Sequence, residues 1–167
     1  DDQLRQSARI PAHCVVLAAA SPKWREELRQ AKAAGQMVLK IDQQCCRSAA
    51  VVEEALHYIY SGEFRGALGV DGRLLWQLLC LCARYSLPPQ LLRYAAAALL
   101  RSLERPDNAV ILPVLLRGAR RVCLSSEEGR YVLYRFLGSS KALLAAGPDQ
   151  KQAETARVAI AEMETLF

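Results

Sequence analysis

A leucine-rich stretch from Val70 to Leu103, interrupted once by two adjacent prolines, constrains the fold more than any other feature of this sequence. Apolar residues recur there every three or four positions, the spacing that lines one face of an α-helix. The residues of this stripe are Leu74, Leu75, Leu78, Leu79 and Cys82. Because proline cannot continue a helix, the sequence "SLPPQ" ends it. We therefore predict a second helix from about Pro89 to Leu103 and no strand after Val70.

The N-terminal part of the chain predicts a short helix followed by a longer one. Proline disfavours helical geometry in the residue before it, so Ile10-Pro11 ends an extended segment, and a short apolar helix follows at about residues 13–19. Ser21 is a preferred N-cap residue, and Pro22 suits the first helical position, where a missing N–H has no cost. We predict that this longer helix ends at Gly35.

The segment after this helix predicts a change of secondary structure. Residues 36–42 ("QMVLKID") are short, rich in apolar residues and bounded by Gly35 and a polar stretch, a pattern typical of a β-strand. From Ser48 to Tyr60 the apolar positions return to helical spacing, and Gly62 ends the helix. The sequence therefore predicts an α+β fold, predominantly helical, with a small sheet.

After Arg105 the pattern is helical throughout. Caps and breaks divide it into short amphipathic segments, and no repeat of fixed period is present. We predict two units, a mixed domain over residues 9–103 and an all-helical extension over residues 105–167.

Composition limits the classes of protein to consider. Of 167 residues, 52% are hydrophobic and 23% are charged, as in folded proteins. No apolar run approaches the ~18 residues that a membrane span needs, and "DDQLRQSARI" lacks the pattern of a signal peptide. We expect no membrane partner and a cytoplasmic or nuclear location. The net charge is +5, but the arginines are scattered among leucines, so we do not expect nucleic-acid binding.

Potential chemistry is confined to two histidines and six cysteines. His13 and Cys14 are neighbours, and neighbouring side chains on a helix diverge, so they cannot form a thiolate and its base. No Cys-x-x-Cys or His-x-x-x-His spacing occurs, so we expect reduced thiols, no metal, no cofactor and no enzymatic activity. Cys45-Cys46 lies at a predicted helix start, where the dipole would lower a thiol pKa, which makes redox sensitivity a hypothesis.

Three ordered motifs resemble those of the BTB/POZ family. The matching residues are Ile10-Pro11-Ala12-His13 with Leu17-Ala18-Ala19 and Ser21-Pro22-Lys23-Trp24, then "ALHYIYSGEF" at 55–64, then "LLCLCARYSLPPQL" at 78–91. The resemblance covers roughly residues 9–103. The helices after Arg105 look like the BACK-type extension that follows many such domains. The family's first strand has no counterpart among the nine residues before Ile10, so we expect it to be missing.

The resemblance implies a protein-interaction module without chemistry of its own. BTB domains commonly form homodimers, and many are substrate adaptors of cullin-3 ubiquitin ligases. We therefore expect an adaptor that recruits cullin-3 and self-associates. The alternative is a structural dimerisation or scaffolding domain of a larger protein, without ligase binding.

The resemblance also suggests which residues contact cullin-3. The expected face consists of the helix at residues 24–30 and the helix following Tyr85. Leu28 is the expected apolar anchor, with Tyr85 and Leu87 at the rim. Cullin-binding adaptors often carry an apolar-x-Glu motif before the strand, and the nearest counterpart is Leu28-Arg29-Gln30, with Gln30 in place of glutamate. We expect Trp24 to lie in the core.

We make two further predictions for residues 13–20. Val15 to Ala20 is expected to be largely core, because the run is apolar. His13 is expected to fix the turn into the first helix through a backbone hydrogen bond.

Overall fold

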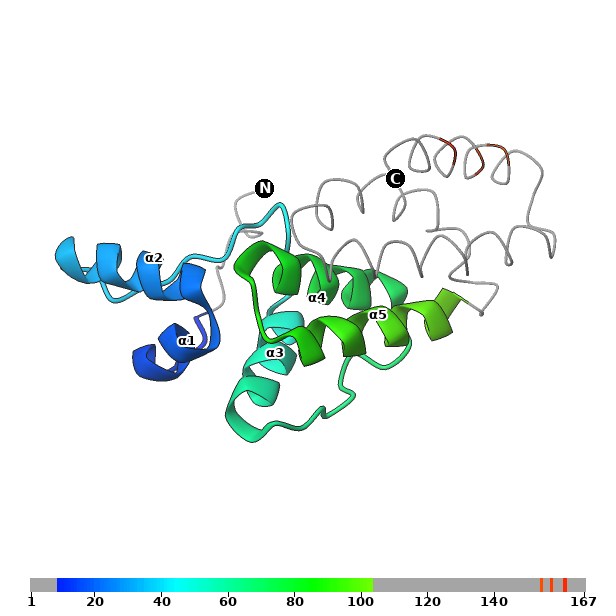
Figure 1. Cartoon of the computed structure of the whole chain (residues 1–167), viewed down its shortest axis with the longest axis horizontal. Coiled ribbons are helices and arrows are strands. Elements are labelled where there is room, and N and C mark those ends of the chain that lie inside the picture. The colour runs from blue at the N-terminus through cyan, green and yellow to red at the C-terminus, as the bar shows by residue number, and fades with distance from the viewer. Residues whose placement is uncertain (1–8, 104–153, 155–156, 158–160, 162–167) are drawn as a thin grey trace, which may run out of the picture.

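Five helices occupy residues 9–103 of the computed structural model (Figure 1). They are α1 (Cys14–Ala20), α2 (Pro22–Ala33), α3 (Ala49–Ser61), α4 (Gly72–Tyr85) and α5 (Pro89–Leu103). The structure describes residues 9–103 and the single positions 154, 157 and 161. Helices α1 and α2 form one end of the described part of the chain, where α2 contacts the end of α4, and α3 packs against α1 and α4 (Figure 1).

The α4–α5 hairpin forms the centre of the core, as the leucine stripe predicts. Asp71 caps α4, because its carboxylate accepts hydrogen bonds from the N–H groups of Arg73 (2.8 Å) and Leu74 (3.2 Å). Helix α4 ends where Ser86 adopts a left-handed conformation with φ 50°. The prediction of a helix from Pro89 to Leu103 is confirmed. Fully buried leucines fill the hairpin: Leu75, Leu78, Leu81 and Leu91.

Helices α1 and α2 confirm the predicted short and long helices. Ser21 lies between them, and its hydroxyl accepts a hydrogen bond from the N–H of Trp24 (3.1 Å), with Pro22 in the first turn of α2. The side chain of Trp24 is only 1% exposed, which confirms that it belongs to the core. Helix α2 ends at Ala33, two residues before Gly35, whose φ of 70° is in the left-handed region.

The predicted small sheet is wrong. Residues 36–42 lie between α2 and α3 without regular structure, and no strand occurs in the described residues. A strand joins a sheet through backbone hydrogen bonds to a neighbouring strand, and within the described residues the backbone from Met37 to Ile41 makes none. The apolar side chains that suggested a strand have other roles: Leu39 and Ile41 pack against the helical core, whereas Met37 and Val38 are each 59% exposed.

Helix α3 carries a buried carboxylate that holds the following loop. Glu54 is fully buried. Its Oε1 accepts a hydrogen bond from the N–H of Gly66 (3.1 Å), its Oε2 accepts one from Ala67 (3.4 Å), and Nε of Arg65 lies 3.7 Å from Oε2. The loop after Gly62 is therefore tied back to the helix that precedes it.

An aromatic stack ties the same loop to the hairpin. The ring of Phe64 stacks on Tyr58 of α3, with centroids 4.4 Å apart, and on Tyr94 of α5, with centroids 3.6 Å apart. Stacked rings add to the stabilisation that burial alone provides. Helices α3 and α5 are thus connected through one loop residue.

The predicted helical extension over residues 105–167 lies outside the described residues, except at three positions. Glu154, Arg157 and Ala161 are helical and exposed, and Nη1 of Arg157 lies 3.6 Å from Oε2 of Glu154.

We expect Glu54→Gln to lower the free energy of unfolding by about 1–3 kcal/mol, because the amide has one acceptor oxygen in place of two and sets a buried NH₂ group against the N–H of Gly66 or Ala67. Urea denaturation followed by circular dichroism measures the loss. The control is Glu53→Gln, an exposed position on the same helix, where the change should stay within about 0.5 kcal/mol. Equal losses in the two variants would contradict this role of Glu54.

Candidate functional site

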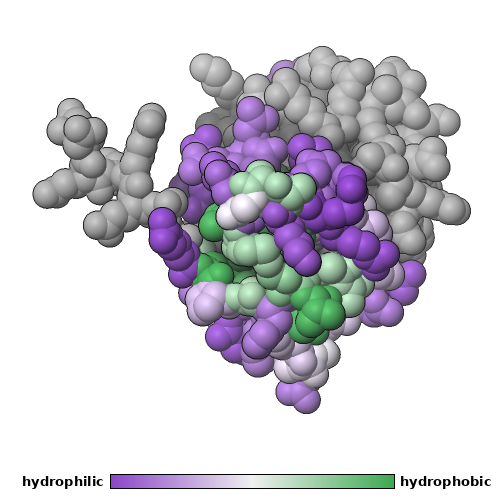
Figure 2. Space-filling model, turned by 90° about the vertical axis from the view of Figure 1, so that its left-hand side faces the viewer, coloured by the Kyte–Doolittle hydropathy of each residue, from purple (hydrophilic) through white to green (hydrophobic). Residues whose placement is uncertain are grey.

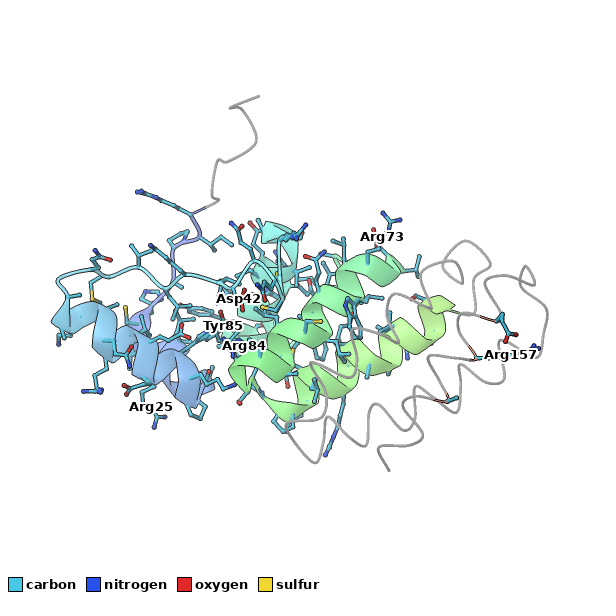
Figure 3. All side chains as sticks on the ribbon, turned by 90° about the horizontal axis from the view of Figure 1, so that it is seen from above. Arg25, Asp42, Arg73, Arg84, Tyr85 and Arg157 are labelled. Atoms are coloured by element: carbon cyan, nitrogen blue, oxygen red, sulfur yellow. The ribbon has the colours of Figure 1, made fainter. Side chains whose placement is uncertain are left out.

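The predicted partner face surrounds one buried residue, Tyr85, at the end of α4. Its side chain is 3% exposed. Its carbonyl accepts a hydrogen bond from the hydroxyl of Ser21, and its hydroxyl accepts one from the N–H of Asp42 at 2.8 Å. Its ring lies against Trp24, with centroids 5.6 Å apart. Tyr85 therefore joins α4 to the start of α2 and to the end of the extended segment (Figure 3). We call these four residues the Tyr85 junction.

Charged side chains surround the junction at the surface. Nε of Arg84 lies 3.6 Å from a carboxylate oxygen of Asp42, and the ammonium group of Lys23 donates a hydrogen bond to the carbonyl of Arg84 (2.6 Å). On the other side of α2, Nε of Arg25 donates to the carbonyl of Ala18 (2.9 Å). These contacts attach the first turn of α2 to both α4 and α1.

The structure places three of the four predicted site residues in the interior. The exposed fractions are 8% for Leu28, 3% for Tyr85 and 5% for Leu87, whereas Gln30 is exposed. Leu28 packs in the core beneath α2, so its side chain is not an exposed anchor. The junction brings Tyr85 and α2 together. The accessible groups of the predicted partner face are the polar side chains on the exposed side of α2.

The exposed face of α2 is a hydrogen-bonded network around Glu26. Arg29 donates two hydrogen bonds to its carboxylate, at 2.9 and 2.7 Å, and the amide of Gln30 donates a third at 2.7 Å. The bonds from Arg29 and then from Gln30 lower the pKa of Glu26 to about 2. The pKa of Tyr85 is raised, mainly by burial of its side chain. The negative charge of Glu27 adds to this increase.

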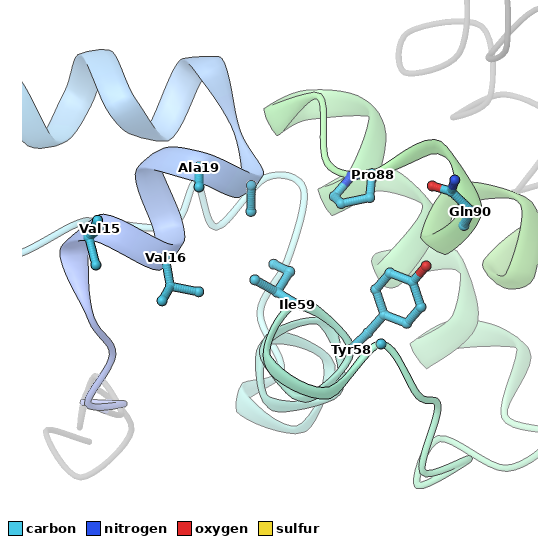
Figure 4. A pocket seen from close by; sticks show the side chains of 9 residues that line it. Val15, Val16, Ala19, Tyr58, Ile59, Pro88 and Gln90 are labelled. Atoms are coloured by element: carbon cyan, nitrogen blue, oxygen red, sulfur yellow. The ribbon is translucent and has the colours of Figure 1, made fainter.

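An open apolar groove of about 630 Å³ lies beside this face, between α1, α3 and the start of α5 (Figure 4). Its walls are Val15, Val16, Ala19 and Ala20 on α1 and Tyr58 and Ile59 on α3, with Gly62, Pro88 and Gln90 completing the lining. Of residues 15–20 only Leu17 is buried, and Val15 is 75% exposed, so the prediction that this run is largely core is wrong. Leu17 faces the core from the opposite side of the short helix, a separation that helical spacing can indicate.

His13 contacts the end of α3. The hydroxyl of Tyr60 accepts a hydrogen bond from the backbone N–H of His13 (2.7 Å) and lies 2.9 Å from Nδ1 of its ring. The backbone carbonyl of His13 accepts bonds from the N–H groups of Val16 and Leu17. The expected backbone role of His13 in the turn is confirmed, and Tyr60 is a partner that the sequence did not reveal.

The prediction of a lowered thiol pKa at Cys45-Cys46 is wrong. Helix α3 begins at Ala49, so the pair precedes the helix. Burial, reinforced by the charge of Asp42, raises the pKa of Cys45 to about 11, and burial also raises the pKa of Cys46. The thiol of Cys45 donates to the carbonyl of Asp42 (3.0 Å).

Two further features are absent from the part of the chain that the structure describes. None of its helices is long and apolar enough to cross a membrane. Within the same residues, no three His, Cys, Asp or Glu side chains gather so that they could hold a metal ion.

Comparison with known proteins found no match: no family model fits this chain, and no curated protein or solved structure resembles it significantly. The resemblance of the three sequence motifs to BTB/POZ domains therefore stays a prediction.

We expect Tyr85→Phe to lower the free energy of unfolding by about 1 kcal/mol, because the N–H of Asp42 loses its acceptor. Chemical denaturation measures the change. Tyr94→Phe is the matched control, since the hydroxyl of Tyr94 has no hydrogen-bond partner within residues 9–103 and its ring stack survives the substitution. A loss in the control as large as that in Tyr85→Phe would exclude a specific role for the Tyr85 hydroxyl.

We expect Cys45 to resist alkylation in the folded protein. Its pKa rises from 9.0 to about 11, so at pH 8 the thiolate fraction falls about 100-fold compared with an ordinary cysteine. Iodoacetamide labelling with mass spectrometry, on the folded and the urea-unfolded chain, measures the ratio. Because the pKa is raised, the folded rate should keep climbing to about pH 11; a plateau at or below pH 9 is the opposing result.

Proposed function

We propose that this chain is a protein-interaction module that acts as a substrate adaptor for a cullin-3 ubiquitin ligase. The ordered BTB/POZ-like motifs support the class of partner. The observation that carries the proposal is the Tyr85 junction, which holds α2 beside the α4–α5 turn in a fixed position. A fixed pair of helices presents side chains at constant separation, which reduces the ordering cost of binding a protein.

The contact residues in this proposal lie on the exposed face of α2. Gln30 follows Glu27 by three residues, so both exposed side chains lie on the same face of α2, and the charge of Glu27 acts on Tyr85 of the junction. Because Leu28 is buried, the partner meets charged and amide groups and not an aliphatic anchor. Polar contacts of this kind give specificity and depend on geometry.

Titration calorimetry of the full chain with the N-terminal helical domain of cullin-3 tests the proposal. We expect Gln30→Lys to weaken binding at least about tenfold, about 1.4 kcal/mol, because it replaces an amide that can accept a hydrogen bond with a cation. The variant should fold, since lysine four residues after Glu26 suits a helix.

Arg73→Glu is the control for this titration. Arg73 lies in the first turn of α4, far from α2 (Figure 3), and its substitution should leave the affinity unchanged. Absence of binding by the unaltered chain, or equal losses in the two variants, would contradict the proposal.

Self-association is a second candidate function, and one observation favours it. Figure 2 shows hydrophobic side chains gathered on the end of the molecule formed by α1 and α2, with hydrophilic ones around them. Val15 and Met37, 75% and 59% exposed, are among the most exposed large apolar residues of the described chain. Exposed apolar patches mark interaction sites. Light scattering separates the candidates: a dimer without affinity for cullin-3 supports a scaffolding domain.

A further inference from the structure

The connection between α2 and α3 carries a run of backbone groups without partners. From Met37 to Ile41, no N–H and no carbonyl makes a hydrogen bond within the described residues. The run is anchored at both ends, because the N–H of Gln36 donates to the carbonyl of Ala31 (2.8 Å) and the N–H of Asp42 donates to the Tyr85 hydroxyl. Figure 1 shows the segment running as an open length of chain from the end of α2 toward α3.

Side chains along this run divide into an inner and an outer set. Leu39 and Ile41 pack against the core and hold the backbone on the helices. Val38 is 59% exposed, and Lys40 is exposed. Inner and outer residues thus alternate from Val38 to Ile41, the pattern of a single strand with one face covered. Such a strand offers its backbone edge to another extended chain.

We propose that residues 37–41 are a docking site for an extended segment of a partner protein, which pairs with this backbone as an added strand. The charge of the outer face indicates the partner's chemistry. Lys40 has no ion pair within the described residues, and the carboxylate of Asp42, two residues further along the chain, lies 3.6 Å from Nε of Arg84. The partner segment therefore carries a carboxylate opposite Lys40 and an apolar side chain opposite Val38, since such cross-strand pairs stabilise pairing.

A second copy of this chain fits the site less well than an acidic strand. Two copies related by a twofold axis pair antiparallel, and pairing centred on Leu39 sets each Lys40 against the Val38 of the other copy. The lysine then has no carboxylate opposite it. This docking site is independent of the cullin-3 proposal, because it uses the connection after α2 and not the exposed face of that helix.

The test uses a short synthetic peptide in which valine and glutamate stand two residues apart, so that both side chains lie on the face opposite Val38 and Lys40. The peptide is N-methylated at every second residue so that it cannot stack on itself. Amide hydrogen exchange of the full chain, followed by NMR, should slow at least about tenfold at alternate residues between Met37 and Ile41, because pairing along one edge protects every second N–H. A peptide methylated at every residue should not bind. Protection outside this segment, or equal binding of the two peptides, would overturn the proposal.

Charge reversal provides the second measurement, by fluorescence anisotropy of the labelled peptide. Lys40→Glu should weaken binding at least about tenfold, and a peptide with lysine in place of glutamate should restore it. Lys32→Glu on α2 is the control and should change neither affinity. Unchanged binding by Lys40→Glu would overturn the assigned chemistry. Concentration-dependent protection of residues 37–41 without peptide would overturn the choice of partner in favour of a second copy.

Discussion

The hydrogen bond from the Ser21 hydroxyl to the carbonyl of Tyr85 is the contact on which the rest of the arrangement depends. The last carbonyls of a helix have no partner within it, and the first N–H groups of a helix have none either. Ser21 provides a partner for one group of each kind: its hydroxyl donates to the carbonyl of Tyr85 at the end of α4, and its oxygen accepts from the N–H of Trp24 at the start of α2. One buried side chain thus ends α4 and begins α2, and replacing it by an apolar residue would leave two buried groups unpaired.

The accessible features of the molecule follow from this contact. With α2 fixed beside the end of α4, the Tyr85 hydroxyl receives the N–H of Asp42 and so determines where the extended segment finishes. Trp24 and Leu28 form the apolar face of α2 and are buried, so the charged face of the helix is turned to the solvent. The fold thus leaves two separate surfaces accessible, the charged face of α2 and the extended segment at residues 37–41.

The sequence predicts the helices well, because their boundaries depend on local chemistry. Ser21 before Pro22 and the break at Pro88-Pro89 act through caps and missing N–H groups, and each needs only a few neighbouring residues. A strand depends on a partner elsewhere, so the short apolar run at residues 36–42 could indicate extended chain but not a sheet. The resemblance placed that pattern in a sheet, and the described residues supply no pairing strand.

The sequence did not predict which residues of the expected partner face are exposed. Leu28 and Gln30 share a helix and differ in burial because one faces Trp24 and the other faces solvent, and this difference depends on how α2 packs against α4. The thiol pKa of Cys45 likewise depends on burial, which no spacing reveals. The contact between His13 and Tyr60 joins residues 47 positions apart, beyond the reach of local patterns.

The hydrogen bond between His13 and Tyr60 fixes the start of α1, a helix of only seven residues. Tyr60 holds His13, the residue before its first turn, and Tyr85 holds Ser21, the residue after its last turn. A seven-residue helix would be marginal by itself, since few internal hydrogen bonds offset the cost of ordering it. Because it is fixed at both ends, the wall that α1 contributes to the groove is ordered before any ligand arrives. When a molecule binds in the groove, the conformational entropy cost would come from ordering that molecule, because this wall of the groove is already ordered.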